Sequence, residues 1–229
     1  MRGFDHINTW VFDLDNTLYP ASCRLFDQMH VRMSDFIVQH LRVDHEQACR
    51  MRREYYLRHG TTLRGLMVEH DMKPDDFLEY VHDIDYDMVK ADSVLQSALA
   101  KLPGRKLVFT NGSAGHAVRV MQRLGVDKHF EGVFDIVDSD YIPKPARLPY
   151  DKFAGQFAID GSRAAFFEDI AHNLETPHAM GMTTVLVTSD EQFSDTDADS
   201  QIHHYVHHTT PDLPNFLIGI AQSLHGEKR

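Results

Sequence analysis

Only two cysteines occur among the 229 residues, Cys23 and Cys49, and neither lies in a Cys-x-x-Cys pair. Two isolated cysteines do not indicate a disulfide framework, so we expect both to be reduced packing residues in a reducing compartment. No apolar run reaches the roughly 18 residues that a membrane-spanning helix needs. The first residues carry no apolar block of the kind found in signal peptides. These absences predict a soluble, cytoplasmic protein.

Basic residues are also scarce. Lys and Arg number 23 against 34 Asp and Glu, which gives a net charge of −11 with neutral His. A chain this acidic is a poor binder of DNA or RNA, because neutralising a phosphate backbone needs a surplus of Lys and Arg. Anionic lipid would repel it as well. We therefore expect neither a nucleic-acid polymer nor a membrane as partner, whereas one small phosphate can still bind where charge is local or a metal is present.

Strand and helix patterns alternate along most of the chain, whose 42% hydrophobic and 25% charged content is that of a globular protein. Strand patterns cover residues 7–13, 105–110, 132–137, 164–168 and 183–187, with a last strand near Tyr205. Helical patterns cover residues 114–124, 148–158, 173–180 and 212–223, and residues 189–200 form a polar loop. This alternation predicts an α/β fold, a Rossmann-like doubly wound parallel sheet.

A long stretch after the first strand breaks the alternation. Residues 24–101 show helical spacing, interrupted near Gly60 and Pro74, and no pattern of a buried strand. Loops in compact α/β units are usually about 2–6 residues long, so we expect an inserted domain here. The predicted boundaries are an all-helical cap domain at residues 20–91 and a core made of residues 1–19 and 92–229. Hinges are expected near residues 19–20 and 91–92.

Chemically active side chains follow four of the predicted strands, at the edge where open parallel sheets bind ligands. One Asp-x-Asp alone could be an acidic turn, a lysine between prolines could be a solvated loop residue, and an acidic pair could cap a helix. Four complementary strand ends in one sheet favour a site. The candidates are Asp13, Asp15 and Thr17 after the first strand, Thr110, Asn111 and Gly112 after the second, Lys144 after the third, and Glu168 and Asp169 after the fourth.

These motifs resemble those of the haloacid dehalogenase (HAD) superfamily of phosphohydrolases. The superfamily pattern is Asp-x-Asp-x-Thr, then Ser or Thr, then Lys, then an acidic pair or spaced acids, and the helical insertion matches a type I cap in position. Within the superfamily, four segments resemble the pyrimidine 5′-nucleotidase branch: residues 12–20, 60–66, 81–83 and 109–112. The resemblance spans nearly the whole chain, and the cap segments are more specific to the branch than the catalytic ones.

The acidic residues gain roles from this resemblance. A carboxylate nucleophile and a phosphate repel each other, and a divalent metal between them removes that cost. Oxygen ligands suit Mg²⁺, which is the expected cofactor. Asp13 is expected to be the nucleophile and a metal ligand, and to form an aspartyl-phosphate. Asp15 is expected to be the general acid and base, and a metal ligand through its main-chain carbonyl. Asp169 and Glu168 complete the expected metal site.

The remaining candidates are expected to bind the phosphate. Lys144 would balance the charge of Asp13 and of the phosphate, a role that suits a compact ammonium group. Thr110 and the backbone around Asn111 and Gly112 would donate hydrogen bonds to phosphoryl oxygens, helped by the start of a helix near Ser113. Such donors stabilise the charge that spreads over the phosphoryl oxygens in the transition state.

The expected function is therefore that of a Mg²⁺-dependent phosphomonoester hydrolase, and more narrowly of a pyrimidine 5′-nucleotidase acting on UMP- or CMP-type substrates. A HAD phosphatase for a sugar phosphate or phosphoglycolate is the main alternative. A receiver-like module that accepts phosphate without turnover is a second, although receivers lack an inserted domain. A dehalogenase is disfavoured by the acid at Asp15 and by the Glu168-Asp169 pair, and nothing requires a mutase. The oligomeric state stays open.

Several further residues are ambiguous from sequence. We expect His116 at an exposed helix position, and His82 and Asp83 to hold the cap together or to join it to the core. Residues 61–64 fit either a helix N-cap or a surface that faces substrate, and Asn173 fits either a helix surface or a supporting role. The pairs at 203–204 and 207–208 favour alternation in a late strand over a zinc site.

Overall fold

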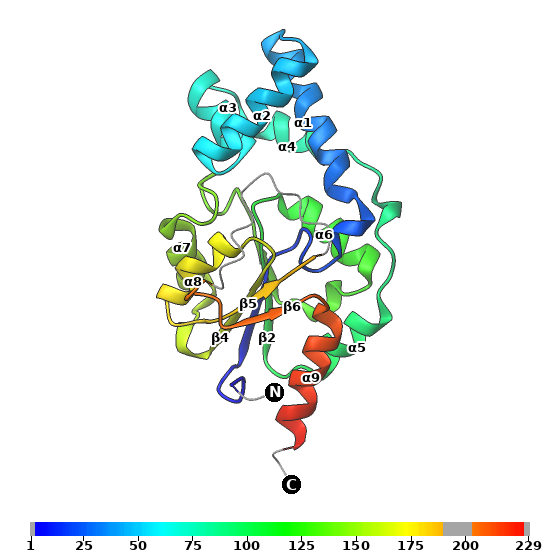
Figure 1. The fold of residues 1–229 in the computed structure, drawn as a ribbon, viewed down its shortest axis with the longest axis vertical. Coiled ribbons are helices and arrows are strands. Elements are labelled where there is room, and N and C mark those ends of the chain that lie inside the picture. The colour runs from blue at the N-terminus through cyan, green and yellow to red at the C-terminus, as the bar shows by residue number, and fades with distance from the viewer. Residues whose placement is uncertain (1–2, 190–202, 227–229) are drawn as a thin grey trace.

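The computed structural model describes residues 3–189 and 203–226 (Figure 1). Its centre is a sheet of six parallel strands in the order β3-β2-β1-β4-β5-β6. Strand bounds are Thr9–Phe12 for β1, Arg105–Phe109 for β2, Gly132–Phe134 for β3, Ala164–Glu168 for β4, Thr183–Val187 for β5 and His208–Thr210 for β6. The order places β1 in the middle of the sheet, so the expected doubly wound parallel sheet is confirmed.

The central strands are apolar because both of their faces are covered. All residues of β1 and of β4 are buried. One face packs on α5 (Ser93–Lys101), α6 (Ala114–Leu124) and α9 (Leu213–Gly226) through a cluster around Trp10, Phe12 and Phe167. The other face packs on α7 (Arg147–Phe157) and the 3-10 turn Ala171–Leu174 through a cluster around Phe109 and Phe166, and α8 (Glu175–Ala179) contacts β5. Continuous apolar strands are what such two-sided burial requires.

Strand register brings the predicted motifs to one edge of the sheet. Phe12 pairs with Val108 on one side and with Phe167 on the other. The three central strands therefore end within about one residue of the same level. The chain segments that leave β1, β2 and β4 start side by side at their carboxyl ends, which is the edge where ligands bind in open α/β sheets.

The insertion between β1 and β2 is helical throughout. It contains α1 (Leu25–Leu41), α2 (His45–His59), α3 (Thr62–His70) and α4 (Pro74–Val81), with short 3-10 helices at Ala21–Cys23 and Tyr86–Met88. Figure 1 shows α1 to α4 grouped above the carboxyl end of the sheet. A separate hydrophobic cluster fills this group, and among the described residues Ile136 is its one buried member from outside the insertion. The exact boundaries 20–91 stay a prediction.

Some element ends differ from those expected. The strand predicted over 132–137 stops at Phe134, because the Asp135 carboxylate accepts hydrogen bonds from the backbone N–H groups of Val137 and Asp138 (2.9 Å each) and turns the chain. The helix predicted over 173–180 is a 3-10 turn, Ala171–Leu174, followed by α8. The late strand begins at His208 rather than near Tyr205. The loop predicted over 189–200 lies outside the described residues except for Ser189.

No helix within residues 3–189 and 203–226 is both long and apolar enough to cross a membrane.

The junction between insertion and core is polar and buried. His82, the residue that follows α4, lies 3.0 Å through Nδ1 from Ser113 Oγ at the start of α6. Its ring stacks on that of His116 with centroids 4.6 Å apart, and its carbonyl accepts a hydrogen bond from Arg119. Asp83 instead pairs with Arg32 of α1 at 2.9 Å. The expectation for this pair is therefore confirmed, since His82 joins insertion to core and Asp83 holds the insertion together.

A substitution of His82 by Asn measures the electrostatic cost of this junction. Burial, helped by the nearby His116, lowers the pKa of His82 from 6.5 to about 3. The unfolded chain takes up a proton near pH 6.5 and the folded chain does not, so the free energy of unfolding falls as the pH drops, by about 2 kcal/mol at about pH 5. Asn keeps an acceptor for Ser113 without titrating. Between about pH 7.5 and about pH 5, the free energy of unfolding of His82→Asn, measured by urea denaturation, therefore falls by about 2 kcal/mol less than that of the wild type.

The control is His40→Asn, at an exposed position of α1. This variant keeps the pH dependence of the wild type. Equal losses in the wild type and in His82→Asn would contradict the prediction.

Candidate active site

A buried ammonium group connects the ends of three strands. Lys144 Nζ donates to Asp13 Oδ1 at 2.7 Å, to Glu168 Oε2 at 2.6 Å and to the carbonyl of Phe109 at 3.1 Å. Its side chain is 1% exposed. The loop that carries Lys144 is held in place by Asn111, whose Oδ1 accepts the Lys144 N–H at 2.9 Å. Lys144 is thus positioned by residues that follow β1, β2 and β4.

The charges of this group are strongly coupled. Burial opposes a charge on Lys144, but Asp13 and Glu168 raise the pKa of its ammonium above the ordinary value. Burial, and then Glu168, raise the pKa of Asp13 to about 7 even though Lys144 works against this rise. Burial, followed by Glu168 and Asp13, raises the pKa of Asp169 well above its ordinary value. One ammonium group therefore does not compensate for three crowded carboxylates.

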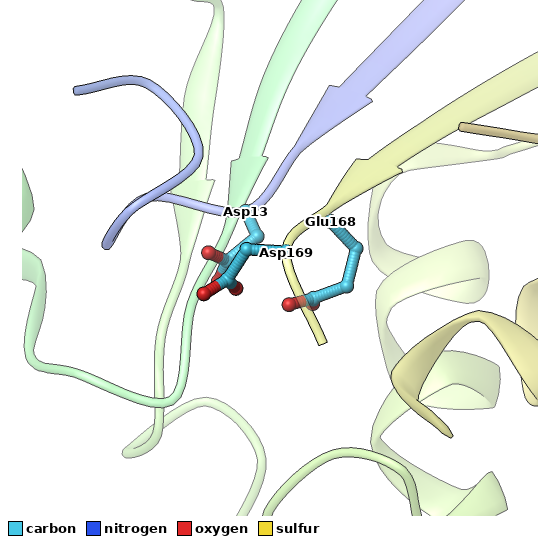
Figure 2. Close-up of side chains that lie close together, drawn as sticks. All are labelled: Asp13, Glu168 and Asp169. Atoms are coloured by element: carbon cyan, nitrogen blue, oxygen red, sulfur yellow. The ribbon is translucent and has the colours of Figure 1, made fainter. Parts of the chain in front are cut away.

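The acidic cluster of Asp13, Glu168 and Asp169 has the donor set of a metal site. One oxygen from each side chain lies within 4.8 Å of the others. Figure 2 shows the three carboxyl groups gathered beyond the ends of β1 and β4. Hard divalent cations such as Mg²⁺ prefer carboxylate oxygens, and a bound cation would relieve the repulsion that raises the pKa of Asp13 and Asp169. The residues present fit a magnesium ion.

No other group of three His, Cys, Asp or Glu side chains within the described part of the chain could share an ion. The histidines at 203, 204, 207 and 208 therefore form no such group. His207 instead contacts Thr184 Oγ1 through Nδ1 at 2.8 Å, and within these residues only His208 belongs to β6.

Asp15 lies in the tight turn after β1 and points to a different set of partners. The turn is possible because Asn16 adopts a left-handed conformation (φ 58°), which Asn tolerates better than most residues. The Asp15 Oδ1 atom accepts from the Tyr19 hydroxyl at 2.5 Å and lies 2.8 Å from His116 Nε2. Burial would raise the pKa of Asp15, but His116, followed by the Tyr19 hydrogen bond, brings it below the ordinary value. The Asp15 side chain is therefore not part of the acidic cluster.

The prediction of an exposed His116 is wrong, because the residue is fully buried. It lies on the same stripe of α6 as Ala117, Val120 and Leu124, which are all buried. The signal was present in the sequence, because His116 stands four residues before Val120 and eight before Leu124, the spacing of one helix face. A polar residue on that stripe indicated a buried partner, and sequence alone did not identify Asp15 as that partner.

The segment after β2 forms a compact turn. Thr110 is buried, and its Oγ1 accepts the N–H of Gly112 at 2.9 Å. A side chain at Gly112 would meet Thr110 Oγ1 at 3.3 Å and the His116 ring at 3.4 Å, so glycine allows this close approach. Asp135, which sequence reasoning missed, takes the N–H of Ala114 at the start of α6 (2.7 Å). Its signal was an acidic residue inside an apolar strand pattern.

The structure shows the surroundings of Asn173 and Thr61, two positions that are ambiguous from sequence. Asn173 is buried, and its carbonyl accepts from the Tyr150 hydroxyl at 2.7 Å, so it is not a surface residue. Thr61 caps α3 by accepting the N–H of Arg64 at 3.1 Å.

A cavity of about 360 Å³ separates the insertion from the core beside Lys144. The insertion and the core approach closely at its edge, since a Cβ on Gly60 would lie 2.8 Å from Pro143 Cγ. Arg64 lines the cavity from α3, and none of the ion pairs among the described residues involves its side chain. The full lining consists of His59, Gly60, Arg64, Val68, Ile142, Pro143, Lys144, Pro145 and Ala146.

Comparison with known proteins identifies the family. The family model of haloacid dehalogenase-like hydrolases matches residues 7–193, and the chain belongs to this family. Phosphate metabolism protein 8 of Saccharomyces cerevisiae is 30% identical over 193 residues, which cover 76% of this chain. The match spans 60% of the length of that yeast protein.

Solved structures of the same family share the fold at low identity. A HAD phosphatase from Thermococcus onnurineus has a TM-score of 0.60 and 14% identity, with 96% of this chain and 99% of that chain covered. The magnesium-bound HAD-hydrolase YfnB from Bacillus subtilis has a TM-score of 0.61 and 12% identity, with 94% and 99% covered. L-2-haloacid dehalogenase from Xanthobacter autotrophicus has a TM-score of 0.54 and 13% identity, with 93% and 98% covered. Phosphatases and dehalogenases thus share this architecture.

Replacement of Lys144 by Met tests how far the site depends on its buried charge. Removing one partner of a buried ion pair costs roughly 3–5 kcal/mol, and here it leaves Asp13 and Glu168 unpaired. The free energy of unfolding of Lys144→Met in metal-free buffer, measured by urea denaturation, falls by about 3 kcal/mol or more.

Lys152→Met provides the control, because Lys152 pairs with Asp140 at the surface, with side-chain exposures of 34% and 71%. Its loss stays below about 1 kcal/mol. Similar decreases in the free energy of unfolding of the two variants would mean that the burial of Lys144 does not increase the cost of removing its charge.

Proposed function

We propose that this HAD-family hydrolase is a Mg²⁺-dependent phosphomonoesterase that works through a phosphorylated Asp13, and more narrowly a pyrimidine 5′-nucleotidase. The observation that carries the proposal is the contact of Lys144 Nζ with Asp13 and Glu168, beside a third carboxylate on Asp169. This arrangement combines a nucleophile, a fixed positive charge and an all-oxygen metal site at the end of a parallel sheet.

Asp13 acts as the nucleophile. One of its carboxylate oxygens forms a bond to phosphorus while the bond from phosphorus to the leaving alcohol breaks. Water then hydrolyses the resulting acyl phosphate and regenerates the carboxylate, so one difficult displacement is divided into two easier ones. The Asp13 backbone is fixed for this task by its N–H, which donates to the carbonyl of Phe167 at 2.9 Å.

Lys144, Thr110, Asn111 and Gly112 provide the phosphate site. Lys144 keeps its charge in the interior, where it balances Asp13 and the incoming phosphate without first shedding water. Thr110 and the backbone of the following two residues are the proposed hydrogen-bond donors. Asp13, Glu168 and Asp169, with the main-chain carbonyl of Asp15, would hold Mg²⁺, which when bound offsets the repulsion between two anions and polarises the phosphoryl oxygens.

Asp15 is the proposed general acid and base. Because its pKa is held below the ordinary value, the Asp15 carboxylate must first take up the proton that it gives to the leaving oxygen as the ester bond breaks, and it later takes a proton from the water that attacks the acyl phosphate. Its side chain is separate from the acidic cluster and 14% exposed, so it can exchange protons with substrate and water. An acid at this position also supports a phosphatase over a dehalogenase.

The nucleotidase assignment is supported by the resemblance of residues 60–66 and 81–83 to that branch. Arg64 of the first segment lines a cavity whose described lining includes Lys144 but none of the three carboxylates of the acidic cluster. A volume of about 360 Å³ lies within the range of small-molecule pockets. Arg64 offers donors that suit the carbonyl oxygens of a pyrimidine. The proposed substrate is a pyrimidine nucleoside monophosphate, with the base on the Arg64 side and the phosphate at Lys144.

Substitution of the two motif aspartates tests the mechanism. Asp13→Asn is folded but has no turnover, because an amide cannot form the acyl phosphate. Asp15→Asn slows both formation and hydrolysis of the intermediate by about 100-fold. Acid-quenched mass spectrometry follows the phosphorylated protein, and EDTA abolishes turnover of the wild type until Mg²⁺ is added.

Asp151→Asn, at the surface in an ion pair with Arg147, is the matched control and keeps wild-type rates. Full activity of Asp13→Asn would overturn the mechanism.

A substrate panel tests the nucleotidase assignment. The wild type hydrolyses UMP and CMP with higher kcat/KM than AMP, phosphoglycolate or hexose phosphates. Arg64→Met raises KM for UMP by about 10-fold, the worth of one hydrogen bond to a charged group, and leaves 4-nitrophenyl phosphate unaffected.

Arg58→Met removes an exposed arginine of α2 that pairs with Glu54, and it changes neither value. If phosphoglycolate or a hexose phosphate is hydrolysed far faster than UMP and CMP, the narrower assignment is wrong while the phosphatase mechanism stands.

A further inference from the structure

The Asp15 carboxyl group is held through a single oxygen. Its Oδ1 atom meets both the Tyr19 hydroxyl at 2.5 Å and His116 Nε2 at 2.8 Å. Within the described residues, no hydrogen bond reaches Oδ2. That second oxygen lies on the side of Gly112, since a Cβ placed there would be 3.8 Å from Oδ2 and 3.3 Å from Thr110 Oγ1. The geometry therefore leaves one oxygen facing the proposed phosphate-binding turn.

The His116 ring has a partner on its other nitrogen. His116 Nδ1 lies 2.9 Å from the Tyr86 hydroxyl, and Tyr86 donates its own proton to the carbonyl of His82 at 3.0 Å. The two ring nitrogens of His116 therefore each have a polar partner, Nδ1 the Tyr86 hydroxyl and Nε2 the Asp15 carboxylate.

Packing prevents the ring from turning. His116 is fully buried, and its ring stacks on that of His82 with an interplanar angle of 16°. His82 is in turn fixed by Ser113, whose Oγ also accepts the backbone N–H of His116 at 3.3 Å. A rotation of the imidazole would break the contacts with both Asp15 and Tyr86 and leave polar atoms unpaired in the interior, which is costly.

Both connections between insertion and core reach this one carboxyl group. Tyr19 belongs to the segment that leads from β1 into the insertion, and Tyr86 belongs to the segment that leads back from α4 to α5. Tyr19 contacts Asp15 directly, and Tyr86 does so through His116. A displacement of the insertion relative to the sheet must therefore change the hydrogen bonds that orient Asp15.

We propose that His116 is a positioning residue: held by Tyr86 and His82 from the insertion side, it fixes Oδ1 of Asp15 so that Oδ2 is presented to the leaving-group oxygen. This inference rests on the proposed function, in which Asp15 protonates that oxygen. His116 thus supports proton transfer to the leaving group and no other part of catalysis.

The test compares substrates that need a proton with one that does not. An alkyl phosphate releases a strongly basic alkoxide and needs the acid, whereas 4-nitrophenyl phosphate releases a stable phenolate. His116→Asn, which places an amide near the Nδ1 position and withdraws from Asp15, lowers kcat/KM for ethyl phosphate by about 100-fold and affects 4-nitrophenyl phosphate far less. His116→Gln, whose longer side chain returns a donor to the Nε2 position, restores most of the loss.

Two tyrosine variants extend the test to the connection with the insertion. Tyr86→Phe removes only the hydroxyl of a half-buried residue and produces the same selective loss in smaller measure. Tyr86→Phe also replaces His116→Asn in this test if thermal unfolding shows that His116→Asn is not folded. Tyr80→Phe removes another hydroxyl of the insertion, one that accepts a hydrogen bond from Gln39 at 2.9 Å, and changes kcat/KM for neither substrate.

The outcomes distinguish the proposed function from the positioning role of His116. A wild type that hydrolyses neither substrate overturns the proposed function itself. The positioning role alone is overturned if the wild type is active and the His116 and Tyr86 variants lower kcat/KM for both substrates by the same factor or change it for neither. Only a loss that depends on the leaving group, rescued by Gln, supports it.

Discussion

The ion pairs of Lys144 with Asp13 and Glu168 are the contacts around which the rest of the site is arranged. A lysine side chain that is 1% exposed needs compensating charge, and the two carboxylates that provide it come from the ends of neighbouring strands. The same ammonium group contacts the carbonyl of Phe109 on a third strand. Opposite charges at these distances, away from water, attract far more strongly than at a surface. The loop bearing Lys144 is therefore tied to the sheet, and the turn after β2 is fixed with it.

Much of this arrangement followed from the sequence because parallel strands impose it. Apolar segments that end in polar residues predict buried strands, and the carboxyl ends of such strands share one edge. That rule alone placed Asp13, Glu168 and Lys144 together, and the structure agrees. The helical insertion was equally predictable, since residues 24–101 show helical spacing with no pattern of a buried strand.

Other contacts could not be predicted because they depend on pairs of residues that are distant in sequence. His116 and Asp15 are separated by 101 positions, and Tyr86 and His116 by 30. Helical spacing indicated a buried face at His116, but not which polar group would meet it there. Asp135 was missed for a different reason, because it ends β3 by binding backbone N–H groups, a local competition that apolar patterning does not register.

The hydrophobic cluster of the insertion shares no buried residue with the two clusters that cover the sheet, although Ile84 packs against both it and the cluster around Trp10, and Leu25 of α1 belongs to the latter cluster. Substitutions that repack α2 to α4 therefore leave the support of Asp13 and Lys144 largely untouched, because no described side chain of these three helices belongs to the clusters that pack on the sheet. Under the proposed function, the sheet edge carries the reacting groups and the insertion faces the leaving group. A library of variants confined to α2, α3 and α4 would then sample new leaving groups while the contacts of Asp13 with Lys144 stay intact.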